Sequence, residues 1–177
     1  MIVRIFLMFK CFMPDKIYDN VYEIDFDELI KKNIKGLIFD IDNTLVSYKQ
    51  PEPTVKVIEL MRNLQAKGFS ICFVSNNKKA RVDLFNREFK FPAFAEAGKP
   101  LKKYMKQALE VMGVTGNQAA MIGDQLFTDI WAGKRVQASA LFVTPIEPVE
   151  TLFFKTKRAL EKPIIKKYRR LENAKKV

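Results

Sequence analysis

The 177-residue sequence contains no histidine. This absence excludes Ser-His-Asp and Cys-His catalysis, zinc sites built on histidine, and a histidine general base. Acid–base chemistry near neutral pH is therefore left to carboxylates, lysine, tyrosine or cysteine. The two cysteines, Cys11 and Cys72, are too few for a disulfide framework and form no CxxC pair. We expect a reducing, cytoplasmic compartment, and any bound metal should be a hard ion held by oxygen.

Long hydrophobic runs are also missing. Residues 1–13 contain eleven apolar side chains together with Arg4 and Lys10. As a helix they would extend only about 20 Å at about 1.5 Å per residue, whereas a bilayer core is about 30 Å thick. No small-residue cleavage site follows, so a secretory signal is not expected. We expect the segment either to lie in a membrane interface or to pack on the protein core.

Charge is abundant and uneven. Lys and Arg number 31 against 20 Asp and Glu, a net charge of +11. Residues 148–177 contain ten Lys or Arg and three Glu, so most of the excess lies there. Such a field attracts anionic membranes, nucleic acids or phosphorylated ligands. We predict an apolar, amphipathic lead over residues 1–33, a core over 34–147, and a basic C-terminal helix or tail over 148–177 that Pro163 breaks.

Short apolar segments alternate with helical patterns between residues 34 and 145. The expected strands cover residues 35–42, 69–74, 94–97, 119–122 and 140–143, and the expected helices cover 54–67, 78–89, 101–112 and 125–135. This alternation predicts an α/β fold with a three-layer, Rossmann-like parallel sheet flanked by helices. In such sheets ligands bind beyond the carboxyl ends of the strands.

Polar clusters follow the expected strands at those ends. Asp40 and Asp42 follow the first strand, about 7 Å apart at their Cα atoms, and would repel each other without a cation or a proton. A plain Asp/Asn-rich turn is the alternative. Ser75 precedes a helix, where it could bind a phosphate oxygen or act as an N-cap. Lys99 could supply a positive charge to a phosphoryl group or lie in solvent.

The last cluster is Gly123-Asp124, followed by Thr128 and Asp129. Each acid there could equally be a simple helix cap. The ordered set is more specific than its parts: DxDxT at Asp40, then Ser75, Lys99 and GDxxxTD at Gly123. In this set the sequence resembles the haloacid dehalogenase (HAD) superfamily over residues 34–145.

A closer resemblance is to the YqeG-type subfamily IIIA phosphatases, relatives of the mitochondrial phosphatidylglycerophosphatase. It rests on the segments 36–45, 74–77, 97–100 and 122–129, and on Met13-Pro14-Asp15 with the following 24–29 segment.

The resemblance implies a role for each matched residue. Asp40 would be the nucleophile and Asp42 the general acid and base. Mg²⁺ would be held by Asp40, Asp124 and the backbone carbonyl of Asp42, with Asp129 in support. Phosphate oxygens would be bound by the side chains or backbone of the following residues: Asn43, Thr44, Ser75, Asn76 and Lys99. Lys99 would also stabilise the transition state.

The intervals between these motifs are short. Residues 43–74 and 76–98 are already occupied by expected loops, helices and strands, so no large cap domain is expected. An open site could accept a bulky substrate. The resemblance therefore predicts a magnesium-dependent phosphomonoester hydrolase whose substrate is phosphatidylglycerophosphate, with peripheral contact to the inner membrane face through residues 1–13 and 148–177. The alternatives are a phosphatase of a soluble metabolite, a phosphomutase or phosphotransferase with the same nucleophile, and a basic RNA- or ribosome-binding protein on the same scaffold.

Overall fold

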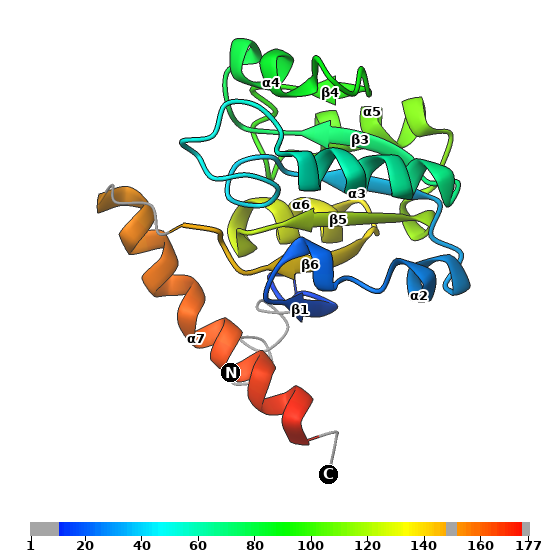
Figure 1. Cartoon of the computed structure of the whole chain (residues 1–177). Coiled ribbons are helices and arrows are strands. Elements are labelled where there is room, and N and C mark those ends of the chain that lie inside the picture. The colour runs from blue at the N-terminus through cyan, green and yellow to red at the C-terminus, as the bar shows by residue number, and fades with distance from the viewer. Residues whose placement is uncertain (1–10, 148–151, 175–177) are drawn as a thin grey trace.

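A single parallel β-sheet forms the centre of the computed structural model, which describes residues 11–147 and 152–174. Its six strands lie in the order β1-β6-β5-β2-β3-β4 (Figure 1). They are β1 (Lys16–Tyr18), β2 (Gly36–Phe39), β3 (Ser70–Val74), β4 (Ala93–Phe94), β5 (Ala119–Gly123) and β6 (Ser139–Val143). Every neighbouring pair is parallel. The α/β prediction is confirmed, and within the described residues no domain is inserted between these elements.

Helices cover both faces of the sheet. They are α2 (Phe26–Lys31), α3 (Val55–Ala66), α4 (Lys79–Asn86), α5 (Lys102–Met112) and α6 (Trp131–Arg135), with short turns η1 (Val21–Glu23) and η2 (Gly116–Gln118) and a π-helical turn η3 (Leu126–Ile130). Side chains of α2, α3 and α4 pack on one face, and those of α5 and α6 on the other. In Figure 1, α3 lies in front of the sheet and α5 behind it.

Strand β2 shows why the sequence folds this way. Leu37 and Phe39 face the α3 side, whereas Ile38 faces the α5 side. All four β2 residues are buried, which is why a central parallel strand reads as a continuous apolar run. Helix α3 then begins where the Thr54 side chain accepts a hydrogen bond from the Val57 N–H at 3.3 Å. The first polar side chain after β2 is Asp40, so burial of β2 fixes its position.

Strand β1 was not predicted from the sequence. Its three residues pair with β6 and extend the sheet at that edge. Just before it, Phe12 contacts the rings of Phe127 and Trp131 edge-on, at 5.0 and 5.1 Å between centroids. The end of the 1–13 segment thus packs on the core, while residues 1–10 lie outside the described residues. No helix in the described ranges is both long and apolar enough to cross a bilayer.

The C-terminal helix α7 (Leu152–Ala174) runs past the β1 edge of the sheet (Figure 1). The prediction that Pro163 breaks this segment is wrong, because the helix continues through it. Proline removes the hydrogen bond to the carbonyl of residue 159, which belongs to an exposed residue, Ala159. Ile164 of α7 is buried in an apolar cluster with Phe142 of β6, and this packing stabilises the helix against the proline.

Candidate active site

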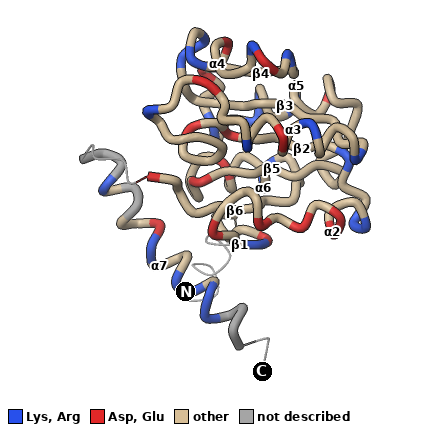
Figure 2. Tube along the Cα trace, viewed as in Figure 1, with Lys and Arg blue, Asp and Glu red and all other residues tan. Residues whose placement is uncertain are grey.

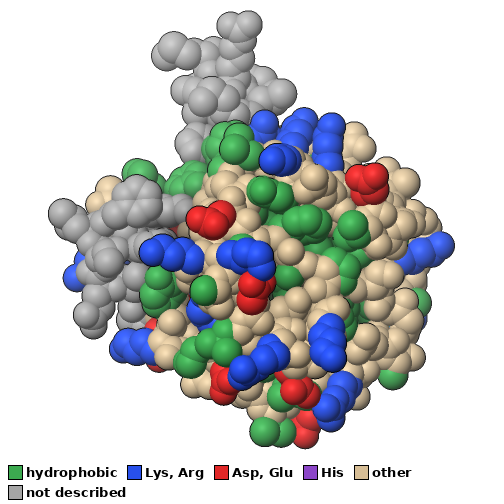
Figure 3. All heavy atoms as spheres, turned by 90° about the horizontal axis from the view of Figure 1, so that it is seen from above, with side chains coloured by type: hydrophobic (Ala, Val, Ile, Leu, Met, Phe, Trp, Pro, Cys, Tyr) green, Lys and Arg blue, Asp and Glu red, His purple; other side chains and the backbone are tan. Residues whose placement is uncertain are grey.

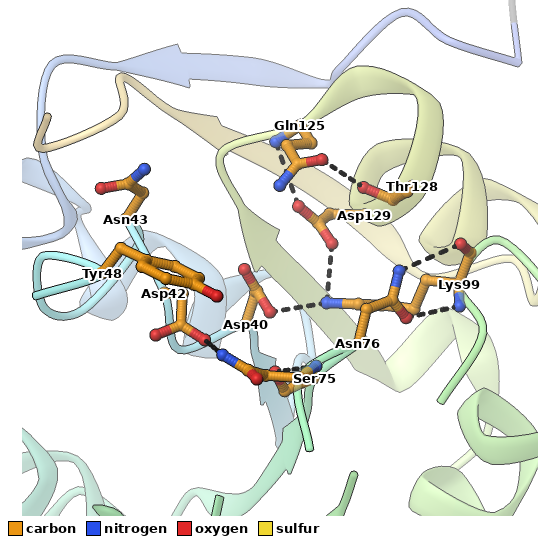
Figure 4. Close-up of a pocket in the computed structure, with 11 residues that line it drawn as sticks. Asp40, Asp42, Asn43, Tyr48, Ser75, Asn76, Lys99, Gln125, Thr128 and Asp129 are labelled. Carbon is orange, nitrogen blue, oxygen red and sulfur yellow. Dashed lines mark hydrogen bonds and ion pairs between the residues drawn. The ribbon is translucent and has the colours of Figure 1, made fainter. Parts of the chain in front are cut away.

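Four loops at the carboxyl ends of β2, β3, β4 and β5 surround a pocket of about 270 Å³ (Figure 4). Parallel strands end at the same edge of a sheet, so their loops converge. The pocket is lined by Asp40, Asp42, Asn43, Tyr48, Ser75, Asn76, Asn77, Lys99, Gln125, Thr128 and Asp129. Two predicted site residues, Thr44 and Asp124, do not line the pocket. Both are buried, and each is next in sequence to a lining residue.

Three carboxylates lie together at the edge of this pocket. Oxygen atoms of Asp40, Asp124 and Asp129 are within 4.8 Å of one another, and all three residues are buried. The Asp42 carboxylate is not part of this group. Gly123 makes the arrangement possible, because a Cβ there would lie 2.4 Å from Cβ of Asp129. The end of β5 can therefore accept Asp129 only with glycine at this position.

The ammonium group of Lys99 lies between two of these acids. Its Nζ is 2.7 Å from Asp40 Oδ1 and 2.7 Å from Asp129 Oδ1 (Figure 4). The backbone of Lys99 is fixed in turn by Asn76, whose Oδ1 accepts from the Lys99 N–H at 2.7 Å and whose Nδ2 donates to the Lys99 carbonyl at 3.2 Å. The loop after β3 therefore positions the lysine that follows β4.

Burial dominates the electrostatics of this group. Burial raises the pKa of Asp40 to about 8; Lys99 opposes the rise, while the Asp129 and Asp124 carboxylates add to it. Burial acts to lower the pKa of Lys99, but Asp129 and Asp40 outweigh it and raise that pKa above its ordinary value. Lys99 is therefore charged, and it is a single positive group facing three acids.

A pH dependence of stability follows for the metal-free protein. The pKa of Asp40 is about 8 in the folded state against an ordinary 3.8, so between these values the folded state binds a proton that the unfolded state has released. Stability contributed by this group is present at low pH and is lost as pH rises toward 8. We expect the Asp40→Asn variant, which lacks the titrating group, to gain stability relative to wild type as pH rises.

Urea denaturation of both proteins in a chelator, at several pH values between about 5 and 8, measures this difference. A difference in unfolding free energy that stays constant across the range would contradict the expectation.

Asp42 has a separate set of partners. Its Oδ1 accepts from Nη2 of Arg81 at 2.9 Å, and its Oδ2 accepts from Nδ2 of Asn77 at 3.0 Å. Neither donor was singled out from the sequence. Asn77 lies in the turn after β3 and Arg81 in the first turn of α4, so no single helix face marked the two donors in the sequence. Both oxygens of Asp42 are thus held by N–H donors.

The remaining pocket residues shape its wall and rim. Ser75 Oγ accepts from the Asn77 N–H at 3.1 Å and so orders the turn after β3. Asn43 has a φ of 62°, a conformation that asparagine tolerates better than most residues. Tyr48 was missed because no pattern marks it; its side chain is 59% exposed at the rim. In Figure 4 its hydroxyl points toward the pocket above Asp42.

Helix α7 reaches the loop after β5 through one buried carboxylate. Glu161 is fully buried, and its Oε1 accepts from the Leu126 N–H at 2.8 Å. The neighbouring Gln125 N–H donates to Asp129 Oδ2 at 3.0 Å. A carboxylate at a helix N-terminus is stabilised by the exposed N–H groups and the helix dipole. The C-terminal helix thus supports the loop that carries Asp129, a contact that the sequence did not predict.

The donor set fits a hard divalent cation. Asp40, Asp124 and Asp129 offer carboxylate oxygens and Lys99 supplies a single positive charge. Magnesium and similar ions prefer oxygen ligands. A cation bound there would offset the repulsion that raises the pKa of Asp40. These three acids could therefore hold a divalent metal at the pocket.

Comparison with known proteins agrees with the fold. The family model of haloacid dehalogenase-like hydrolases matches residues 47–137. "Probable phosphatase YqeG" from Bacillus subtilis (strain 168) is 32% identical over 161 residues, which cover 91% of this chain and 94% of that protein.

Solved structures share the fold at low identity. A cobalt-bound deoxy-D-mannose-octulosonate 8-phosphate phosphatase from Haemophilus influenzae has a TM-score of 0.52 and 15% identity over 71% of this chain and 75% of its own. A HAD family enzyme from Bacteroides thetaiotaomicron, in a magnesium complex, has a TM-score of 0.51 and 12% identity over 68% of this chain and 98% of its own. The likeness to YqeG extends over nearly the whole chain, and the family model covers half of it. The chain therefore belongs to the haloacid dehalogenase-like hydrolases, and it is a phosphatase.

Proposed function

We propose that this phosphatase is a Mg²⁺-dependent phosphomonoester hydrolase in which Asp40 is the nucleophile and forms an aspartyl-phosphate. The observation that carries the proposal is the position of Asp40, at the pocket wall and beside both Lys99 and two further carboxylates. Cys72 is a poor alternative nucleophile, because burial raises the pKa of its thiol to about 12. Histidine is absent, and we assign the acid–base chemistry to a carboxylate of the pocket lining.

Two steps follow from these residues. In the first, an Asp40 oxygen attacks phosphorus, the bond from phosphorus to the leaving oxygen breaks, and Asp42 gives that oxygen its proton. In the second, Asp42 takes a proton from water as the water oxygen attacks phosphorus. The bond between phosphorus and Asp40 then breaks, which releases inorganic phosphate and restores both acids. Phosphoryl transfer of this kind depends mainly on positioning and charge neutralisation.

Magnesium would be held by the carboxylates of Asp40, Asp124 and Asp129, with the Asp42 backbone carbonyl as a further oxygen. When bound, it supplies positive charge that offsets the charge of the phosphoryl oxygens. The proposal takes support from the donor set and from the buried negative charge that Lys99 leaves unbalanced.

Phosphate oxygens would be bound by Lys99 and by donors of the loops after β2 and β3. The Ser75 hydroxyl lines the pocket. The Thr44 hydroxyl and the Asn43 side-chain oxygen are buried without a hydrogen-bond partner, so Thr44 still has a proton to donate. The Asn76 amide is already used on Lys99. We therefore assign Asn76 to positioning Lys99, with its backbone as the remaining phosphate donor.

The proposed substrate is phosphatidylglycerophosphate or a similar anionic phospholipid. No domain covers the pocket within residues 11–147 and 152–174. Two exposed apolar side chains lie near it: Tyr48 in its rim and Ile146, whose N–H bonds to the Asn43 carbonyl at 3.1 Å. Helix α7 adds exposed positive charge (Figure 2), carried by Lys155, Lys162, Lys166, Lys167, Arg169 and Arg170. Each such residue near an anionic bilayer contributes about 1 kcal/mol. This proposal puts the protein in the cytoplasm, peripherally at the inner membrane face.

A basic RNA- or ribosome-binding role is the less favoured alternative. On the face seen in Figure 3, Lys and Arg are interspersed with Asp and Glu instead of forming a single-sign stripe. Nucleic-acid binding relies on a continuous basic surface, and the buried acids of the pocket would have no use in it.

We expect Mg²⁺-dependent phosphate release from phosphatidylglycerophosphate in anionic vesicles, abolished by a chelator and restored by Mg²⁺. The Lys166→Gln/Arg170→Gln variant should bind such vesicles more weakly, by about 2 kcal/mol, and hydrolyse the soluble 4-nitrophenyl phosphate as wild type does. Vesicle flotation and phosphate release measure the two effects. A protein that hydrolyses only soluble phosphates and does not bind vesicles would refute the lipid proposal and leave the phosphatase assignment intact.

A further inference from the structure

The guanidinium group of Arg81 joins the acid–base residue to a loop at the pocket rim. Its Nη2 donates to Asp42 Oδ1 at 2.9 Å and to the Gln50 carbonyl at 2.8 Å, and its Nη1 donates to the Pro51 carbonyl at 2.6 Å. The side chains of Arg81 and Asp42 are each only 14% exposed. The planar guanidinium group has several N–H donors that point in different directions, so it can bind a carboxylate and two carbonyls at once. A lysine ammonium group cannot reproduce this geometry.

The loop fastened in this way, residues 47–53, carries Tyr48 at the pocket rim. The ion pairs that also attach this loop to the rest of the protein are exposed and therefore weak. Arg87 pairs with Glu52 at 2.6 Å and Lys49 with Glu147 at 3.8 Å, with the side chains between 42% and 83% exposed. Exposed pairs of this kind contribute about 0–1 kcal/mol. Arg81, which donates to two backbone carbonyls of the loop, is therefore its partly buried anchor.

The position of Tyr48 relates this loop to the leaving group. In-line attack by Asp40 would expel the leaving oxygen on the far side of phosphorus. Tyr48 and Asp42 lie on the other side of Asp40 from Lys99 (Figure 4), and we take them as the neighbours of that oxygen. The proton for that oxygen comes from Asp42 in the mechanism above. A residue that holds the Asp42 carboxyl group in place relative to Tyr48 therefore also holds this proton donor in place relative to the leaving oxygen.

We propose that Arg81 is a positioning residue, which locks the Asp42 carboxylate to loop 47–53 so that the proton donor and the leaving-group wall formed by Tyr48 keep one geometry. The proposal rests on the proposed role of Asp42. A merely structural role, such as packing of the Arg81 guanidinium over the Phe85 ring at 5.7 Å, would lower the rate for all substrates equally. A positioning role would lower it most where leaving-group protonation matters most.

The test compares 4-nitrophenyl phosphate, whose leaving group needs little protonation, with phenyl phosphate, whose leaving group needs more. General acid catalysis contributes about 10²–10⁴-fold, so Asp42→Asn should lose far more activity on phenyl phosphate. Arg81→Met should show the same selectivity, with kcat for phenyl phosphate falling about tenfold more than kcat for 4-nitrophenyl phosphate. Arg87→Met, which cuts an exposed contact to the same loop, is the matched control and should leave both rates near wild type.

Two outcomes separate the possible failures. If Asp42→Asn is selective and Arg81→Met lowers both rates equally, the positioning role of Arg81 is wrong while the mechanism stands. If Asp42→Asn itself shows no selectivity, the acid role of Asp42 in the proposed function is wrong, and the role of Arg81 fails with it. If circular dichroism shows that Arg81→Met does not fold, Arg81→Lys is measured in its place. A ratio of kcat for phenyl phosphate to kcat for 4-nitrophenyl phosphate that equals the wild-type ratio would then overturn the proposal.

Discussion

Replacing Asp40 with asparagine is expected to abolish phosphate release while the protein stays folded. The amide is a poor nucleophile, so the covalent step has no replacement, and loss of a nucleophile costs on the order of 10⁴–10⁶-fold in kcat. The amide can still accept from Lys99, whose Nζ lies 2.7 Å from Asp40 Oδ1. The amide also cannot ionise, whereas Asp40 must do so among three crowded acids as pH rises toward 8, so the metal-free variant should be no less stable than wild type.

Steady-state hydrolysis of 4-nitrophenyl phosphate and thermal unfolding measure the two halves of this prediction. Asp83→Asn is the matched control, because Asp83 is an exposed carboxylate that pairs with Lys79 on the surface of α4. Wild type quenched in acid during turnover should also carry a hydroxylamine-labile phosphoryl group, and the variant should carry none. Retention of near wild-type activity by folded Asp40→Asn would exclude Asp40 as the nucleophile.

Replacing Lys99 with methionine is expected to impair both activity and stability. The Lys99 side chain is 2% exposed and contacts Asp40 and Asp129. Removing it leaves three buried acids without their countercharge, and breaking a buried pair costs about 3–5 kcal/mol. Loss of a positive group from the transition state should lower kcat by about 10²–10³-fold, by analogy with a lost oxyanion donor.

Urea denaturation with and without Mg²⁺ tests the physical cause. A bound dication would replace part of the missing charge, so Mg²⁺ should stabilise Lys99→Met more than it stabilises wild type. Lys102→Met serves as the control, since Lys102 is exposed at the start of α5. If Lys99→Met unfolds at the same urea concentration as Lys102→Met, the buried ammonium does not have the electrostatic role assigned to it.

Much of the scaffold was predictable because local pattern and tertiary structure agree. The run ending at Phe39 is apolar at every position, and it forms the central strand. Asp40, Ser75, Lys99 and Asp129 follow four such strands, and parallel pairing alone is enough to bring them to one pocket. Their convergence follows from topology and does not depend on the details of side-chain packing.

The missed features depend on contacts between distant segments. Arg81 bonds to Gln50 and Asp42, which lie about one helix and one strand earlier in the chain, and no periodicity encodes that meeting. Strand β1 has three residues, too few for a period-two pattern to be visible. Pro163 is a helix breaker by propensity, yet tertiary packing of α7 overrides that propensity.

The bond from Glu161 to Leu126 bears on where the smallest independently folding unit ends. The stretch recognised by the family model stops at residue 137, and a chain shortened to it would lose the carboxylate that satisfies a buried backbone N–H next to the loop of Asp129. It would also uncover Leu126 and Ile130, which α7 helps to shield. The loop that carries Asp129 and the C-terminal helix are thus parts of one cooperative unit, and residues far outside the matched stretch set the boundary of an independently folding fragment.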